Sequence, residues 1–233
     1  MTRMTNMIMR EAGGTRIALA LVLAAGIAAA RAQQAQPAAA AVKVACVGDS
    51  ITAGYGAAPQ ESYPAVLGKL LGSGYEVGNF GVSGATLMKK GDLPYWGLDA
   101  FKKAGDCAPN LVVLMLGTND SKERNWAGKA AFAADYRALI EHFRQLPSKP
   151  QVWVCLPAPV YGKGAFGITD PVVKNEIIPL IRKVAEELQA PVIDVNAALS
   201  NHAELQPDTV HPNAAGYKLL AETIAQAIAP PAK

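Results

Sequence analysis

The sequence contains few residues that could build a metal centre or a disulfide framework. It has only three cysteines in 233 residues, and it contains no CxxC pair or Cys/His cluster typical of a metal site. An odd number of cysteines also excludes a fully paired set of disulfides within one chain. Cys46 and Cys155 lie inside apolar runs, so we expect both thiols to pack as small hydrophobic groups. We predict no metal and no cofactor.

Long hydrophobic runs are also missing. The apolar segment at residues 17–30 has about 14 residues, whereas a membrane-spanning helix needs about 20. It follows three arginines and precedes a small-x-small triplet at 30–32, the pattern of a secretory signal peptide. We therefore predict that residues 1–32 are a signal peptide cleaved near Ala32, with an uncleaved anchor as the alternative. The mature protein would be periplasmic or secreted, with no stable membrane span.

The mature chain has no excess of charge of either sign. The whole sequence has 22 basic and 19 acidic residues, and residues 1–32 hold four arginines and one glutamate, which leaves 18 of each. The apparent basic balance therefore belongs to the export segment. A neutral chain is not expected to bind nucleic acid or an acidic membrane surface through its charge.

Internal repeats and a second domain are absent as well. Residues 33–41, rich in alanine, glutamine and proline, are predicted to be a flexible tail, and residues 42–233 a single domain of ordinary size. Residues 42–47 are a candidate for a buried strand, and residues 75–80 are a weaker one. Apolar runs typical of strands in a parallel sheet covered on both faces occur at 111–116, 152–156 and 192–195. One-sided apolar faces, typical of helices, occur at 132–143, 173–188 and 217–228.

This alternation predicts an α/β protein, a three-layer α/β/α sandwich around a parallel sheet. Ligands in such folds bind beyond the carboxyl ends of the strands, so the residues that follow each strand are the ones to inspect. Pro179 lies inside the second helical segment and is expected to kink or split that helix, because proline lacks an N–H group.

Two common catalytic or binding motifs are missing at the strand ends. The glycines after the first strand do not have G-x-G-x-x-G spacing, and no GK[ST] follows them, which argues against nucleotide binding. There is also no G-x-S-x-G segment, the nucleophile turn of α/β-hydrolase lipases.

Four polar, glycine-rich segments do follow the predicted strands or precede the last helix: GDSIT at 48–52, NFGVSG at 79–84, GTND at 117–120 and DTVHP at 208–212. Together they supply the groups that acyl transfer requires. Ser50 is a candidate nucleophile and His211 its base, since a serine hydroxyl needs a neighbouring base. Asp208, three residues before His211, could orient the imidazole.

An oxyanion that develops during the reaction would need preorganised hydrogen-bond donors. The backbone N–H groups of Ser50 and Gly84 and the side-chain amide of Asn119 are the candidates.

These four segments, in this order, resemble blocks I, II, III and V of the SGNH (GDSL-type) hydrolases. The resemblance extends from residue 42 to the C-terminal helix. It implies a flavodoxin-like fold with a five-stranded parallel sheet. It also implies Ser50 as nucleophile, Gly84 and Asn119 as oxyanion donors, and Asp208 and His211 as the rest of a catalytic triad.

Each of these residues also has a structural alternative. Ser50 could cap a helix, Asn119 could be a turn residue, and His202, in a loop near Asp208, is a rival base. Asp49 and Asp120 are expected to hold their loops through local hydrogen bonds.

The substrate is less well defined by the sequence. Loops 89–100 and 156–169 and the segment after GTND contain aromatic residues that could stack on sugar rings: Trp96, Tyr161, Phe166 and Trp126. The alternative is that they anchor their loops by ordinary packing. The chain resembles secreted bacterial esterases that include carbohydrate O-acetylesterases, so the expected partner is a small-acyl ester such as an acetylated carbohydrate. A lysophospholipase or thioesterase and a non-catalytic carbohydrate-binding protein are the other hypotheses.

Overall fold

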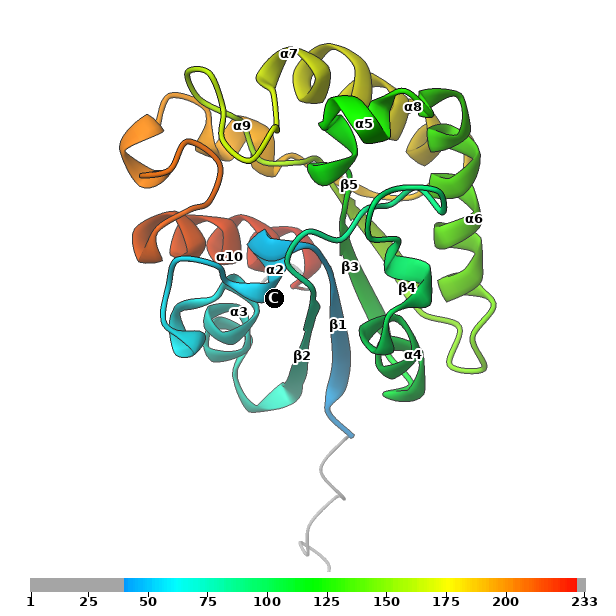
Figure 1. Cartoon of the computed structure of the whole chain (residues 1–233). Helices are drawn as coiled ribbons and strands as arrows, with labels where there is room; N and C mark the ends of the chain where they lie inside the picture. The colour runs from blue at the N-terminus through cyan, green and yellow to red at the C-terminus, as the bar shows by residue number, and fades with distance from the viewer. Residues whose placement is uncertain (1–39, 230–233) are drawn as a thin grey trace, which may run out of the picture. The chain divides into compact units, whose positions relative to one another are not determined.

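Five parallel strands form the centre of the protein, as a computed structural model that describes residues 40–229 shows (Figure 1). They are β1 (Val42–Gly48), β2 (Tyr75–Gly81), β3 (Leu111–Met115), β4 (Gln151–Cys155) and β5 (Val192–Ile193), in the order β2-β1-β3-β4-β5. The predicted signal peptide and most of the predicted tail at 33–41 lie outside the described residues, so both remain predictions.

Helices cover both faces of the sheet (Figure 1). The α-helices are α2 (Ser50–Ala53), α3 (Tyr63–Leu71), α4 (Asp99–Asp106), α5 (Glu123–Trp126), α6 (Phe132–Arg144), α7 (Asp170–Val172), α8 (Ile178–Glu187), α9 (Val195–Leu199) and α10 (Ala214–Ile228). Short 3₁₀ turns are η1 (Pro59–Glu61), η2 (Gly72–Gly74), η3 (Tyr95–Gly97), η4 (Asn119–Ser121), η5 (Lys129–Ala131) and η7 (Ala203–Leu205), and η6 (Val173–Ile177) is a π-helical segment.

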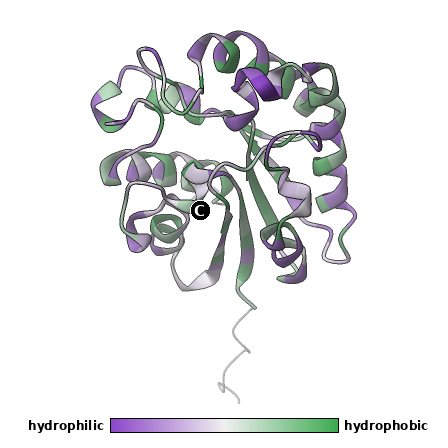
Figure 2. Cartoon of the chain, viewed as in Figure 1, coloured by the Kyte–Doolittle hydropathy of each residue, from purple (hydrophilic) through white to green (hydrophobic). Residues whose placement is uncertain are grey.

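The alternating side chains of β1 show how the two hydrophobic layers form. Ala45 and Val47 pack in one cluster with α4, α6 and α8, whereas Val44 and Cys46 pack in the other with α3, α9 and α10. Both faces of the strand are therefore covered, which explains its apolar sequence over residues 44–47. Figure 2 shows the same pattern, with hydrophobic colour along the central strands and mixed colour on the helices. The predicted three-layer α/β/α fold is confirmed.

Two elements differ in detail from the simple pattern. β5 ends at Ile193 rather than at residue 195, because Asp194 caps α9, its carboxylate accepting a hydrogen bond from the N–H of Ala197 at 2.8 Å. The helix predicted over 173–188 is split, and α8 begins with Pro179 in its first turn after the π-helical segment. The break lies where proline cannot donate a helical hydrogen bond.

Candidate active site

The turn from β1 into α2 presents the hydroxyl of Ser50. Asp49 caps α2, since its Oδ1 accepts a hydrogen bond from the N–H of Ile51 at 3.0 Å. Ser50 is the first residue of the helix. The capping role that was an alternative for Ser50 is thus filled by Asp49, and the serine hydroxyl is available for another partner.

That partner is His211, which lies 161 positions later in the chain. Ser50 Oγ and His211 Nε2 are 2.8 Å apart, and His211 Nδ1 and Asp208 Oδ2 are 2.7 Å apart. Both Ser50 and His211 are buried, with exposed fractions of 7% and 6%. A serine, an imidazole and a carboxylate connected in this way can activate a hydroxyl for attack on an acyl group.

The loop around Asp208 holds the carboxylate in place. Asp208 Oδ1 accepts hydrogen bonds from the N–H groups of Val210 at 3.0 Å and His211 at 2.7 Å. Thr209 between them has a φ of 74°, a left-handed conformation that is strained for a β-branched residue. Partial burial acts to raise the pKa of Asp208, but hydrogen bonds from His211 and Val210 outweigh it, and the pKa is lowered. The carboxylate is therefore ionised at neutral pH and accepts the Nδ1 proton, which leaves Nε2 to face Ser50.

Asn119 and Gly84 lie beside Ser50. The side-chain amide of Asn119 donates one hydrogen bond to the carbonyl of Ala85 at 3.1 Å, which fixes its orientation and leaves its second N–H. Gly84 has a φ of 84°, a region that side chains disfavour. Both residues line a pocket of about 160 Å³ with Ser50 and His211; its other residues are Tyr55, Ser83, Lys122, Phe166 and Ile168.

A buried carboxylate connects the loops that carry Gly84 and Asn119. Asp120 accepts hydrogen bonds from the N–H groups of Leu87 at 2.9 Å and Met88 at 2.8 Å. Burial raises the pKa of Asp120 to about 6, although these bonds act against the shift. The expectation of local hydrogen bonds is confirmed for Asp49, whereas the Asp120 carboxylate accepts hydrogen bonds from a different loop.

A further close contact joins the second loop to the nucleophile turn. A Cβ atom added to Gly81 would lie 2.2 Å from the backbone nitrogen of Ala53, so no other residue fits there without displacing α2. The loops that follow β1, β2 and β3 thus meet at one edge of the sheet, as expected for a parallel fold.

Comparison with known proteins decides the family. The model of the GDSL-like lipase/acylhydrolase family matches residues 46–219. The chain belongs to this family. Its five-stranded sheet between helices is the fold of the family's esterase structures.

Several similar proteins act on acetyl or aryl esters by name. The chain is 38% identical over 208 residues to an acetylxylan esterase of Xylanibacter ruminicola, a match that covers 81% of this chain and 43% of that protein. The chain thus spans less than half the length of this relative. Among solved structures, a proposed arylesterase from Agrobacterium tumefaciens shares 27% identity with a TM-score of 0.66, covering 80% of this chain and 98% of that one.

A carbohydrate acetylesterase family member from Sinorhizobium meliloti shares the fold, with a TM-score of 0.63, 23% identity, and coverage of 80% of this chain and 97% of that chain.

The four predicted aromatic residues are not together. Phe166 lines the pocket beside Ser50, and its ring centroid lies 5.3 Å from that of His211. Trp126 lines a neighbouring hollow and donates its indole N–H to Glu176 at 2.9 Å. Trp96 packs against Phe101 and donates to the carbonyl of Leu87.

The contacts of Tyr161 agree with the alternative role, in which an aromatic residue anchors its loop. Its hydroxyl donates to the carbonyl of Leu199, and its N–H donates to the carbonyl of Thr209 at 2.9 Å. It therefore supports the strained loop that carries Asp208. Neither Tyr161 nor Trp96 is among the residues that line the pocket beside Ser50.

Sequence reasoning did not identify Tyr55. Its ring centroid is 4.4 Å from that of His211, and almost half of the residue is exposed, 48%. Its position five residues after Ser50, between two glycines, was the only available signal. His202, the rival base, instead pairs with Glu204, its Nδ1 lying 3.0 Å from Oε1.

Proposed function

We propose that the protein is a serine esterase that removes acetyl groups from carbohydrates. The observation that carries the proposal is the chain of hydrogen bonds from Ser50 Oγ through the ring of His211 to Asp208, at 2.8 and 2.7 Å. The intact chain of hydrogen bonds favours an enzyme over a binding protein that keeps only the fold.

The chemistry follows from these contacts. Ser50 Oγ attacks the ester carbonyl carbon while its proton passes to His211 Nε2. The negative charge on the carbonyl oxygen is stabilised by the N–H groups of Ser50 and Gly84 and by the amide of Asn119. When the tetrahedral intermediate collapses, the bond to the alcohol oxygen breaks and that oxygen takes the proton from His211. An acetyl group then remains on Ser50.

Water completes the cycle. His211 Nε2 takes a proton from a water molecule, which attacks the acyl carbon of the acetylated Ser50. When the second tetrahedral intermediate collapses, its bond to Ser50 Oγ breaks and Oγ takes the proton back from His211. Acetic acid leaves and ionises to acetate in water. Asp208 keeps its negative charge throughout and stabilises the protonated imidazole.

Two features favour acetyl groups on a carbohydrate. The pocket beside Ser50 has a volume of about 160 Å³, which is small compared with the roughly 300–1,000 Å³ of sites for drug-sized ligands. The acetylxylan esterase relative acts, by its name, on an acetylated polysaccharide. The predicted signal peptide would bring the enzyme to the compartment where such polymers occur.

The test is the Ser50→Ala variant, compared with the unmodified protein on p-nitrophenyl acetate and on O-acetylated xylo-oligosaccharides. We expect kcat to fall by about 10⁴-fold or more, as in other triads, while the circular dichroism spectrum and unfolding midpoint stay the same. If a folded Ser50→Ala protein keeps most of its activity, Ser50 is not the nucleophile.

A further inference from the structure

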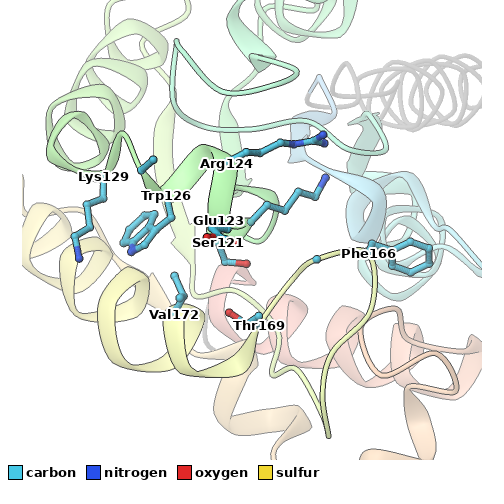
Figure 3. Close-up of a pocket in the computed structure, with 11 residues that line it drawn as sticks. Ser121, Glu123, Arg124, Trp126, Lys129, Phe166, Thr169 and Val172 are labelled. Atoms are coloured by element: carbon cyan, nitrogen blue, oxygen red, sulfur yellow. The ribbon is translucent and has the colours of Figure 1, made fainter.

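A larger hollow adjoins the pocket beside Ser50. It has a volume of about 790 Å³ and lies between α5 and the segment that leads into α7 (Figure 3). We call it the α5–α7 groove. Its lining residues are Ser121, Lys122, Glu123, Arg124, Trp126, Ala127, Lys129, Phe166, Gly167, Thr169 and Val172.

The groove is continuous with the proposed catalytic pocket. Lys122 and Phe166 line both of them. In Figure 3 the labelled Phe166 lies at one end of the groove and Trp126 at the other. A substrate whose ester carbonyl sits at Ser50 can therefore extend past Phe166 into the groove.

The three cations that line the groove are paired. Lys122 and Arg124 both form ion pairs with Asp92, and Lys129 lies 2.7 Å from Glu176. Neither Asp92 nor Glu176 lines the groove, but together with the lining residue Glu123 they balance the three cations. The charges in and beside the groove therefore sum to zero, which gives no net attraction for an anionic chain.

The uncharged part of the groove surface contains both polar and apolar groups. The hydroxyl-bearing residues Ser121 and Thr169 lie beside the apolar side chains of Ala127 and Val172. A sugar chain has hydroxyl groups at its edges and apolar ring faces, so it matches such a surface. An alkyl chain would instead remove water from ion pairs without replacing their hydrogen bonds, which is unfavourable.

We infer that the α5–α7 groove binds the sugar chain on the alcohol side of the ester, and that this chain is an oligosaccharide of uncharged sugars. The inference rests on the proposed function for the same site and adds the substrate class. The volume is within the range of pockets that enclose ligands larger than one sugar ring. The enzyme is therefore expected to act on acetylated oligosaccharides more efficiently than on an acetylated monosaccharide.

The test uses a side chain that fills the groove. Ala127 is exposed and ends α5 in a right-handed helical conformation, so Ala127→Trp adds bulk without entering the core. Ala130→Trp is the matched control, because Ala130 is also exposed and does not line the groove. Acetate release is measured on p-nitrophenyl acetate, acetylated xylose and acetylated xylo-oligosaccharides of increasing length.

For the unmodified protein and Ala130→Trp, kcat/KM should rise from acetylated xylose to the longer oligosaccharides. In Ala127→Trp this gain should be lost, with a fall of about tenfold or more on the long substrates, while p-nitrophenyl acetate and acetylated xylose are hydrolysed at the normal rate.

Four outcomes would overturn the inference. If kcat/KM does not depend on length, or if Ala127→Trp keeps the dependence, the groove does not hold the chain, and the proposed function stands because acetate is still released. A gain seen only with chains that carry uronic acids would contradict the uncharged substrate. If the unmodified protein releases no acetate from any carbohydrate, the proposed action on acetylated carbohydrates is itself wrong.

Discussion

At the scale of single residues, Asn119 is held from two sides. Its side-chain amide donates to the backbone carbonyl of Ala85, and its backbone carbonyl accepts a hydrogen bond from the side-chain amide of Asn125 at 2.9 Å. This fixed position suits a donor that acts on charge present only in the transition state. We therefore expect Asn119→Ala to lower kcat by roughly 10²–10³-fold with little change in KM.

Steady-state kinetics on p-nitrophenyl acetate would measure both parameters. A variant with a raised KM and normal kcat would instead mean that Asn119 binds the substrate in its ground state.

The two histidines near the Asp208 loop provide a matched pair. His211 is buried against Ser50, whereas the side chain of His202 is 47% exposed and contacts Glu204. If His211 is the base, His211→Ala loses activity by several orders of magnitude, because the variant lacks the imidazole nitrogen that lies 2.8 Å from Ser50 Oγ and takes its proton. His202→Ala should retain most of its activity in the same assay. The reverse result would transfer the role of base to His202.

The limits of sequence reasoning are clear at these residues. Ser50, Asn119, Asp208 and His211 could be predicted because each lies in a motif at a strand end or just before the last helix, and the structure brings them together. Tyr55 and the groove residue Lys122 carry no such signal. Their place beside Ser50 depends on how the loops fold over the sheet, which local sequence patterns do not encode.

At the scale of elements, the start of α2 contains a buried carboxylate. Burial raises the pKa of Asp49 to about 7, despite the hydrogen bond from Ile51, and Asp49 Oδ2 has no hydrogen-bond partner among the described residues. Between about pH 4 and pH 7, Asp49 therefore keeps its proton in the folded protein, whereas in the unfolded chain, with a carboxyl pKa near 4, it has lost it. Between about pH 4 and pH 7 this group makes the folded state less stable as pH rises, by about 4 kcal/mol in total.

The variant Asp49→Asn removes this titration but keeps an oxygen for the N–H of Ile51. We expect the unfolding free energy of the variant, relative to the unmodified protein, to increase from pH 4 to pH 7 and then to stay constant. Urea unfolding at a series of pH values would measure it. Parallel curves for the two proteins would show that Asp49 is ionised in both states throughout this range.

Elements differed in how well the sequence predicted them. β1 and β3 were clear because both of their faces are covered, and β2, at the sheet edge, was weaker because much of it is only half-buried. The break near Pro179 could be predicted from the sequence, because proline lacks the N–H group that a helix interior requires. For the aromatic residues of loops 89–100 and 156–169, the sequence left open whether they bind substrate or anchor their loops. Trp96 and Tyr161 form hydrogen bonds that anchor the loops.

At the scale of the whole molecule, the site joins distant parts of the chain. The hydroxyl of Tyr217 in α10 donates to the carbonyl of Tyr55 at 2.9 Å, so the last helix supports the turn after Ser50. Of the helices described, none combines the length and apolar character needed to cross a membrane. Under the proposed function, the small pocket beside Ser50 holds the acyl group and the wider α5–α7 groove holds the alcohol.

This division predicts how the enzyme selects acyl chains. An acetyl group fits a pocket of about 160 Å³, whereas an octanoyl or palmitoyl chain must displace Phe166 or lie against the ion pairs of the groove. Removing water from those ion pairs costs free energy. We therefore expect kcat/KM to fall steadily from acetyl to butyryl, octanoyl and palmitoyl p-nitrophenyl esters.

The variant Phe166→Ala serves as the control for the cause of this selectivity. Phe166 is 57% exposed, so its removal should enlarge the pocket without unfolding the protein and should raise the ratio of butyryl to acetyl kcat/KM. An unchanged ratio would mean that Phe166 does not limit the acyl chain. Faster turnover of octanoyl or palmitoyl esters by the unmodified protein, with no acetate released from any glycan, would favour a lysophospholipase or thioesterase, because only a longer acyl site could produce that order of substrates.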